Sequence, residues 1–256
     1  MNIRTVAEIL FIASLFLILV YAMMGYPDIG FVRPLGEFYL YNSFNEGNST
    51  WWSAAPNALT GLLWDYRGYD TLYETMVFYI GATAAVIFFE RAVPLRQSKG
   101  MSMIVRASAK LIFIFITTTA IVITIFSVKT SGGGFQGGSI LAIAYIVILV
   151  ALSKGFLPYL KINIERAHLI RILGLVIIIG LALTPVVFSL ITGINAYALQ
   201  NQPKQWSPFG FPPFLGLRSL SGGNIIPLSI GEMLQVGMGF TLMFVLLTLK
   251  EDGEEE

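Results

Sequence analysis

The chain contains no cysteine and only one histidine among its 256 residues. Without thiolates it cannot ligate an iron–sulfur cluster, hold a thiolate-bound zinc ion, form a disulfide or attach haem covalently. One histidine cannot supply a bis-imidazole haem site or a multi-histidine metal centre either. We therefore expect no cofactor in this chain, and any associated redox chemistry must carry its electrons through another protein.

Charge is also scarce, because charged residues make up 12% of the chain and hydrophobic residues 55%. Soluble domains have about a quarter of their residues charged. The 16 Lys and Arg residues against 15 Asp and Glu residues leave a net charge of +1, so no basic field is available to hold nucleic acid. This composition predicts an integral membrane protein that binds no nucleic acid.

Six apolar runs are long enough to cross a lipid bilayer as helices, which takes about 20 residues each. Lipid disfavours unpaired backbone polar groups, and the runs are too long and too irregular for barrel strands, so helices are predicted. The predicted fold class is therefore all-α, a polytopic membrane protein with about six transmembrane helices. The predicted spans are residues 6–24, 71–89, 107–128, 137–153, 167–191 and 226–249.

Six spans place both termini on one side of the membrane. That side would hold 11 of the 16 Lys and Arg residues, among them Arg4, Arg91 and Arg171. Because basic residues concentrate on the cytoplasmic side, we expect cytoplasmic N and C termini in a prokaryotic cell membrane. Residues 251–256 form an acidic run that is expected to be a solvated tail.

Two long connecting segments, residues 25–70 and 192–225, are rich in aromatic residues. Aromatic side chains favour the bilayer interface or a protein surface over free water. The apolar run at 56–64 is too short to cross, which suggests a re-entrant or surface-lying helix. We expect both segments to pack on something rather than to hang free.

A glycine-rich motif lies between the third and fourth spans. It formally satisfies G-x-G-x-x-G, but the nucleotide fingerprint needs a preceding strand and a later acidic residue, and here apolar spans flank the motif. In a membrane such glycines favour tight helix packing and a sharp hairpin, or they expose backbone amides at the start of the next span. A direct contact with an ion is the alternative. The glycines are Gly132, Gly133, Gly134, Gly137 and Gly138.

A charged cluster of Arg67, Asp70 and Glu74 stands at the entrance to the second span. Thr71 and Glu74 have the spacing of a capping box, which would be a purely structural role. However, Asp70 and Glu74 share a helix face, and Arg67 is near enough to compensate one of them. Paired acids near lipid depth can exchange a proton for a cation, so capping and an ion pathway both remain open.

In the sixth span, Glu232, Gln235 and Gly239 recur at i, i+3 and i+7, which places them on one helical stripe. Ionisable residues at membrane depth are candidates for function, although Glu232 could instead be a hydrated helix end. His168 is interpreted as a lone surface histidine. No Ser–His–Asp set or nucleophile elbow is present, so we expect no enzymatic activity in the chain by itself. Metal ligands remain unknown.

Two stretches resemble one family. Residues 62–74, Leu-Leu-Trp-Asp-Tyr-Arg-Gly-Tyr-Asp-Thr-Leu-Tyr-Glu, resemble the C-terminal part of the large A subunit of multisubunit Mrp-type Na⁺/H⁺ antiporters. Residues 131–138, Ser-Gly-Gly-Gly-Phe-Gln-Gly-Gly, followed by an apolar helix, resemble the B subunit, although the usual His-Asn-type lead-in with proline is replaced by Thr130-Ser131. The resemblance predicts an A-like segment at 1–95 with two spans and a B-like domain at 96–256 with four.

Such a fusion resembles the arrangement in archaeal ferredoxin-driven respiratory complexes. The resemblance implies a subunit that takes part in Na⁺/H⁺ translocation, with Na⁺ as a transported ion. The implied partners are other antiporter-like membrane subunits, the lipid bilayer and a hydrogenase- or sulfur-reductase-like peripheral module. It assigns Glu74 to the ion route with Arg67; we add Asp70 as a tuning group and Glu232 as a second candidate.

Two other functions compete with this interpretation. A purely structural membrane subunit would only hold neighbouring ion channels in place. A stand-alone small-solute transporter should contain two related halves with broken helices, and the sequence shows no such repeat.

Overall fold

A computed structural model describes residues 3–24, 32–48, 50–88, 93–94, 101–152, 164–246 and 249–250. Nearly all of the regular structure is helical, and six helices are long and apolar enough to cross a membrane. The prediction of an all-α multi-pass membrane protein is therefore confirmed. These helices are α1 (Ile3–Met24), α4 (Gly68–Phe88), α5 (Met103–Ile125), α6 (Gly134–Leu152), α7 (Ile164–Thr192) and α8 (Ile225–Leu246).

The chain forms two compact units, Met1–Phe38 and Tyr39–Glu256. The first unit holds α1 and the start of α2 (Pro34–Ser43), and no described side chain of α1 is buried. The division at residue 95 falls outside the described residues and stays a prediction, and the acidic tail at 251–256 also lies outside them. A short antiparallel pairing joins β1 (Val93–Pro94) to β2 (Leu249–Lys250).

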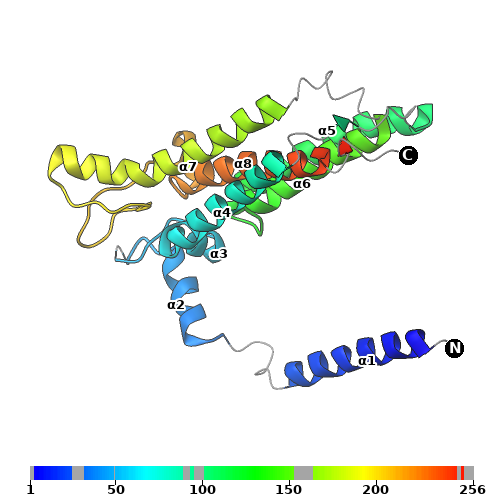
Figure 1. The fold of residues 1–256 in the computed structure, drawn as a ribbon. Coiled ribbons are helices and arrows are strands. Elements are labelled where there is room, and N and C mark those ends of the chain that lie inside the picture. The colour runs from blue at the N-terminus through cyan, green and yellow to red at the C-terminus, as the bar shows by residue number, and fades with distance from the viewer. Residues whose placement is uncertain are drawn as a thin grey trace. The chain divides into compact units, whose positions relative to one another are not determined.

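Helix α8 is the central element of the second unit, with 67% of its most apolar stretch buried. Helices α4, α5, α6 and α7 all pack against it (Figure 1). Its buried Met233, Met238 and Leu242 join Leu141 of α6 in one apolar cluster. A helix this enclosed, in a chain that spans a membrane, is shielded from lipid and can carry polar groups.

Glycines allow the backbones of α6, α7 and α8 to approach closely. A Cβ atom at Gly138 of α6 would lie 2.8 Å from the Cβ of Val236, and one at Gly231 of α8 would lie 2.8 Å from the carbonyl oxygen of Gly174 on α7. Such distances are below normal contact, so a larger residue would force the helices apart. Gly132 has a φ of +147° in the turn that leads into α6.

The two connecting segments contain short helical turns. The run predicted as a short helix forms α3 (Ala58–Gly61) and the π-helical turn η1 (Leu62–Tyr66), and Asn57 accepts a hydrogen bond from the Leu59 N–H as the helix cap. Trp64 of η1 is buried. Further turns are η2 (Phe126–Val128), η4 (Phe214–Gly216) and η5 (Arg218–Leu220).

Candidate functional site

Glu232 lies inside the helix core. It follows the first residue of α8 by seven positions, about 10 Å along the helix axis, and its exposed fraction is 5%. Its carboxylate accepts hydrogen bonds from the backbone N–H groups of Gly134 and Phe135, the first two residues of α6. These are amides that an α-helix leaves without internal partners at its positive end. The glycine-rich motif thus presents backbone donors to a buried acid.

Burial of Glu232 is incompatible with the alternative of a hydrated helix end. Gly134 makes the contact fit, because a Cβ atom there would lie 2.6 Å from the Cβ of Glu232. Among the described residues, no Lys, Arg or His forms an ion pair with this carboxylate. Within the described part of the chain, its hydrogen-bond donors are therefore backbone amides and not a counter-charge.

Glu74 of α4 lies near Glu232 and interacts with it electrostatically. It lines an open groove of about 550 Å³ with Asp70, Tyr73, Val77, Phe78 and Phe135. Phe135 links the two acids, since its backbone N–H binds Glu232 and its ring packs 6.1 Å from the ring of Phe78. The wall of the groove therefore runs from the exposed carboxylate of Glu74 to Phe135 at the start of α6, whose backbone contacts the buried carboxylate of Glu232.

Arg67 pairs with Asp70 and not with Glu74. The Arg67 Nε lies 2.6 Å from the Asp70 Oδ2, and these side chains are 63% and 61% exposed. The capping box is absent, because α4 begins at Gly68 and the Thr71 hydroxyl donates to the Leu63 carbonyl. Glu74 has no hydrogen-bond or ion-pair partner among the described residues.

Arg171 is a buried charge, although the predicted topology groups it with the cytoplasmic basic residues. Its side chain is fully buried on α7, and its Nη2 donates to the Tyr79 carbonyl at 2.8 Å and to the Thr83 hydroxyl at 3.2 Å. The guanidinium lies 4.5 Å from the centre of the Tyr79 ring. His168 is not the lone surface histidine expected, because it is half-buried with its Nδ1 3.3 Å from the Arg171 Nη1.

Gln235 is a third buried polar residue of the helix core, three residues after Glu232 on α8. It is fully buried on α8, and its Nε2 donates to the Thr75 carbonyl of α4 at 3.3 Å. Within the described segments, its Oε1 has no hydrogen-bond partner, and neither has the buried hydroxyl of Ser229. Buried polar atoms are nearly always hydrogen-bonded, so a buried polar atom without a protein partner marks a position where water or an ion can bind.

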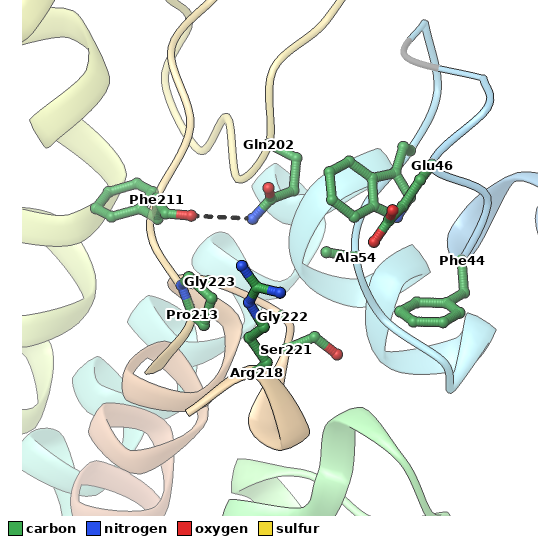
Figure 2. A pocket seen from close by; sticks show the side chains of 11 residues that line it. Phe44, Glu46, Ala54, Gln202, Phe211, Pro213, Arg218, Ser221, Gly222 and Gly223 are labelled. Atoms are coloured by element: carbon green, nitrogen blue, oxygen red, sulfur yellow. Dashed lines mark hydrogen bonds between the residues drawn. The ribbon is translucent and has the colours of Figure 1, made fainter. Parts of the chain in front are cut away.

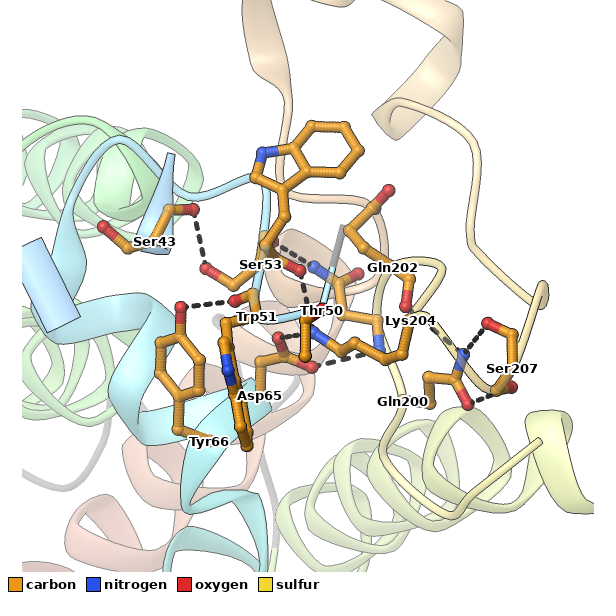
Figure 3. A network of polar contacts seen from close by, with 12 residues as sticks. Ser43, Thr50, Trp51, Ser53, Asp65, Tyr66, Gln200, Gln202, Lys204 and Ser207 are labelled. Atoms are coloured by element: carbon orange, nitrogen blue, oxygen red, sulfur yellow. Dashed lines mark hydrogen bonds and ion pairs between the residues drawn. The ribbon is translucent and has the colours of Figure 1, made fainter. Parts of the chain in front are cut away.

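The two connecting segments bind each other through a polar network that we call the polar cap, formed by residues 42–66 and 197–224. Lys204 is its centre, with its Nζ 2.8 Å from the Asp65 Oδ2 and 2.7 Å from the Trp52 carbonyl (Figure 3). Asn201 donates to the Ser53 carbonyl at 2.7 Å and accepts from the Asn224 N–H at 2.9 Å. The expectation that the two segments pack on something is thus met for residues 42–66 and 197–224, which pack on each other. Because Asn224 directly precedes α8, the cap also fixes the end of the helix that carries Glu232.

Burial raises the pKa values of two residues of the polar cap, Asp65 and Tyr66. Burial raises the pKa of the Asp65 carboxyl, and the charge of Lys204 opposes this shift. Burial likewise raises the pKa of Tyr66 to about 12, and its hydroxyl donates to the Trp51 carbonyl at 2.6 Å. Tyr66 is therefore protonated and a hydrogen-bond donor at neutral pH.

A pocket of about 390 Å³ opens between the two segments of the polar cap. Figure 2 shows Glu46 and Arg218, of opposite charge, on its wall with Phe44 and Phe211. Gly223, also on this wall, precedes Asn224 and the start of α8. Within the described ranges, no group of three or more His, Asp or Glu side chains could hold a metal ion.

Replacing Lys204 by methionine is expected to lower the free energy of unfolding by about 3 kcal/mol, because Asp65 would stay buried without its counter-charge. Adding Asp65→Asn should restore most of this loss, since a buried pair can often be replaced by neutral groups. The matched control is Arg67→Met, which breaks an exposed pair and should cost less than about 1 kcal/mol. Thermal unfolding in detergent measures all three, and equal losses for the two single variants would contradict the account.

The Lys204→Met variant should also be more sensitive to pH. Because the pKa of Asp65 is raised above its ordinary 3.8, the folded chain binds this proton more tightly than the unfolded chain does. This carboxyl contributes stability that is complete below pH 3.8 and is lost as the pH rises through the folded pKa. Loss of Lys204 removes the charge that opposes this shift and raises that pKa further, so the variant should lose more stability than wild type as the pH rises above 3.8. The double variant should lack this additional slope.

Comparison with known proteins identifies similar sequences and folds. The family model of a domain related to the MnhB subunit of Na⁺/H⁺ antiporter matches residues 104–242, which include the glycine-rich motif, Arg171 and Glu232. An uncharacterized protein of Methanocaldococcus jannaschii is 24% identical over 193 residues, which cover 65% of this chain and 74% of that protein.

Two solved structures have a similar fold. A chain in the structure of the membrane-bound sulfane sulfur reductase, an archaeal respiratory membrane complex, aligns with a TM-score of 0.70 at 24% identity, over 98% of this chain and 100% of that one. A chain in the structure of the Mrp complex from Dietzia sp. DQ12-45-1b aligns with a TM-score of 0.65 at 16% identity, over 100% of this chain and 27% of that one.

Proposed function

Because the chain belongs to the family of domains related to the MnhB subunit of Na⁺/H⁺ antiporters, we propose that it takes part in Na⁺/H⁺ translocation as a membrane subunit of an antiporter module. The observation that carries this proposal is the pair of acids at the junction of α4, α6 and α8. Glu232 is buried against the amides of α6, and Glu74 lines the groove beside it. A carboxylate that faces a groove, as Glu74 does, and can hold either a proton or Na⁺ makes the two ions compete, and competition is the basis of exchange.

The exposure of Glu74 supports a larger assembly. Charged side chains within membrane-spanning helices face protein or water and not lipid tails. Glu74 lies in the second turn of α4 with its side chain exposed in the isolated chain. A neighbouring antiporter-like subunit that covers the groove would enclose Glu74 and leave it access to ions.

The wider setting is part of the same proposal. The similarity in fold to a chain of an archaeal respiratory membrane complex favours a module attached to a ferredoxin-driven oxidoreductase in a prokaryotic cell membrane. In that setting both termini would face the cytoplasm. The chain itself would bind no redox cofactor and perform no catalysis.

Replacing Glu74 by glutamine tests this function against a purely structural role. In the purified complex in proteoliposomes, Glu74→Gln should lower Na⁺-driven proton flux at least about tenfold, equivalent to about 1.4 kcal/mol. Glu37→Gln, an exposed acid of α2 outside the groove, is the matched control and should leave the flux unchanged. An intact complex with normal flux in the Glu74→Gln variant would reduce the chain to a scaffold. Activity of the isolated chain would instead favour a stand-alone transporter.

A further inference from the structure

We propose that a proton-selective passage runs through this chain from the junction of α4, α6 and α8, where Glu232 accepts the proton, into the interface of α4, α7 and α8, where Gln235 relays it and Arg171 excludes Na⁺. This inference rests on the proposed function and deepens it, because it assigns one of the two ions to a route of named residues. The route runs from the polar cap end of α8 toward the end of the helices where α7 begins.

The buried polar groups follow one another at intervals of about one helical turn. Gln235 lies three residues after Glu232 on α8 and therefore on the same side of the helix. Gln235 donates to the Thr75 carbonyl, and Arg171 donates to the Tyr79 carbonyl on the same face of α4. These two acceptors are four residues apart, which is about 6 Å along a helix. His168 continues the series beside Arg171.

Orphaned polar atoms along this interface indicate that hydrogen-bonded groups or water occupy it. The Gln235 Oε1, the Arg171 Nε and the Ser229 hydroxyl are buried and have no hydrogen-bond partner among the residues that the structure describes. A buried polar atom without a partner is destabilising, so bridging water is favoured where it fits. A short chain of water from Glu232 past Gln235 would satisfy them and conduct protons.

The same interface is unsuited to Na⁺. A hard cation needs a shell of several oxygen ligands. Where α7 and α8 meet, a Cβ atom at Gly231 would already lie 2.8 Å from the Gly174 carbonyl oxygen, so the two helices cannot accommodate such a shell at that point. The Glu232 carboxylate already accepts two hydrogen bonds from the positive end of α6. Arg171 adds a fixed positive charge, and no described carboxylate pairs with it.

Proton transfer leaves every group as it was at the end of each cycle. A proton binds the Glu232 carboxylate from the polar cap end, near Glu74 of α4 and the α6 amides. It then passes along bridging water beside the Gln235 Oε1 to His168, whose Nδ1 faces Arg171, with Tyr79 of α4 packed on the guanidinium. His168 hands the proton on at its end of the helices. No electron moves in this sequence.

Flux measurements on the purified complex in proteoliposomes test the passage. Gln235→Leu should lower Na⁺-driven proton flux at least about tenfold, because it removes the relay. Thr241→Val is the matched control, because Thr241 is buried on the same helix and its hydroxyl donates to the Gly237 carbonyl of that helix. This variant should retain the wild-type flux. Arg171→Gln should admit a passive leak of ²²Na⁺, and Arg171→Lys should suppress it by keeping the charge.

Carbodiimide labelling gives a readout that does not depend on flux or on the Arg171 variants. Dicyclohexylcarbodiimide should modify Glu232 in the wild-type complex, and excess NaCl should not protect it, as mass spectrometry of the modified peptide would show. Protection by Na⁺, or normal proton flux in an intact Gln235→Leu complex, would overturn the passage. If Glu74→Gln and Glu232→Gln abolish antiport while Gln235→Leu behaves like Thr241→Val, only this inference fails. If both acid variants retain antiport, the proposed function fails as well.

Discussion

Replacing Glu232 by glutamine is expected to lower Na⁺/H⁺ antiport by the assembled complex on the order of a hundredfold, the usual effect of losing a positioned proton-transfer group. Glutamine has nearly the same shape, and its carbonyl oxygen can still accept from the Gly134 and Phe135 amides. It cannot bind or release a proton. The fold should therefore survive while the transport function is lost.

The specificity of this effect is measured against Thr241→Val on the same helix. Both side chains are buried, with exposed fractions of 5% for Glu232 and 3% for Thr241. Size-exclusion chromatography of both complexes establishes that assembly is intact before flux is compared. Wild-type antiport in the Glu232→Gln complex would show that the buried acid only caps α6.

The second large effect is expected for stability, at the glycine that faces Glu232. A valine at Gly134 would place its Cβ 2.6 Å from the Glu232 Cβ and against the Ser229 carbonyl. Backbone cannot yield as a flexible side chain can, and overpacking of this kind costs about 3 kcal/mol or more. We expect Gly134→Val to lower the thermal unfolding midpoint markedly and to separate α6 from α8.

Gly81→Val is the matched control for this substitution. Gly81 lies within α4, and a Cβ atom there would meet nothing within 4 Å. Valine has a better helix propensity than glycine, so the change should be neutral or stabilising by a few tenths of a kcal/mol. Equal unfolding midpoints for the two variants would contradict the close packing of α6 on α8.

Hydrophobic length was sufficient to predict all six spans, because crossing lipid imposes a minimum apolar run. The helix ends were less predictable. The fourth span was predicted from residue 137, but α6 begins at Gly134, because glycines carry little hydrophobic signal even where their amides bind Glu232. The second span was predicted from residue 71, but α4 begins at Gly68. The Thr71 hydroxyl donates to the Leu63 carbonyl in the π-helical turn η1 that precedes the helix.

The contacts that define the site could not be predicted from spacing along the chain. Asp65 and Lys204 are 139 residues apart, and no local pattern relates them. Arg171 was assigned to a membrane surface because topology rules place charges at helix ends, whereas the structure buries it against Tyr79 of α4. The sequence feature that could have predicted this burial is the position of Arg171 inside the apolar run 167–191. By contrast, the stripe of Glu232, Gln235 and Gly239 followed directly from helical periodicity.

The most direct test of the account is a double-mutant cycle on the two acids in the reconstituted complex. Na⁺-driven proton flux should be measured for Glu74→Gln, Glu232→Gln and the double variant under identical conditions. If both carboxylates serve one route, the double variant should be no slower than the more severe single variant, because residues that act as a unit are non-additive. Losses that multiply, or wild-type flux in either single variant, would contradict a shared route through Glu74 and Glu232.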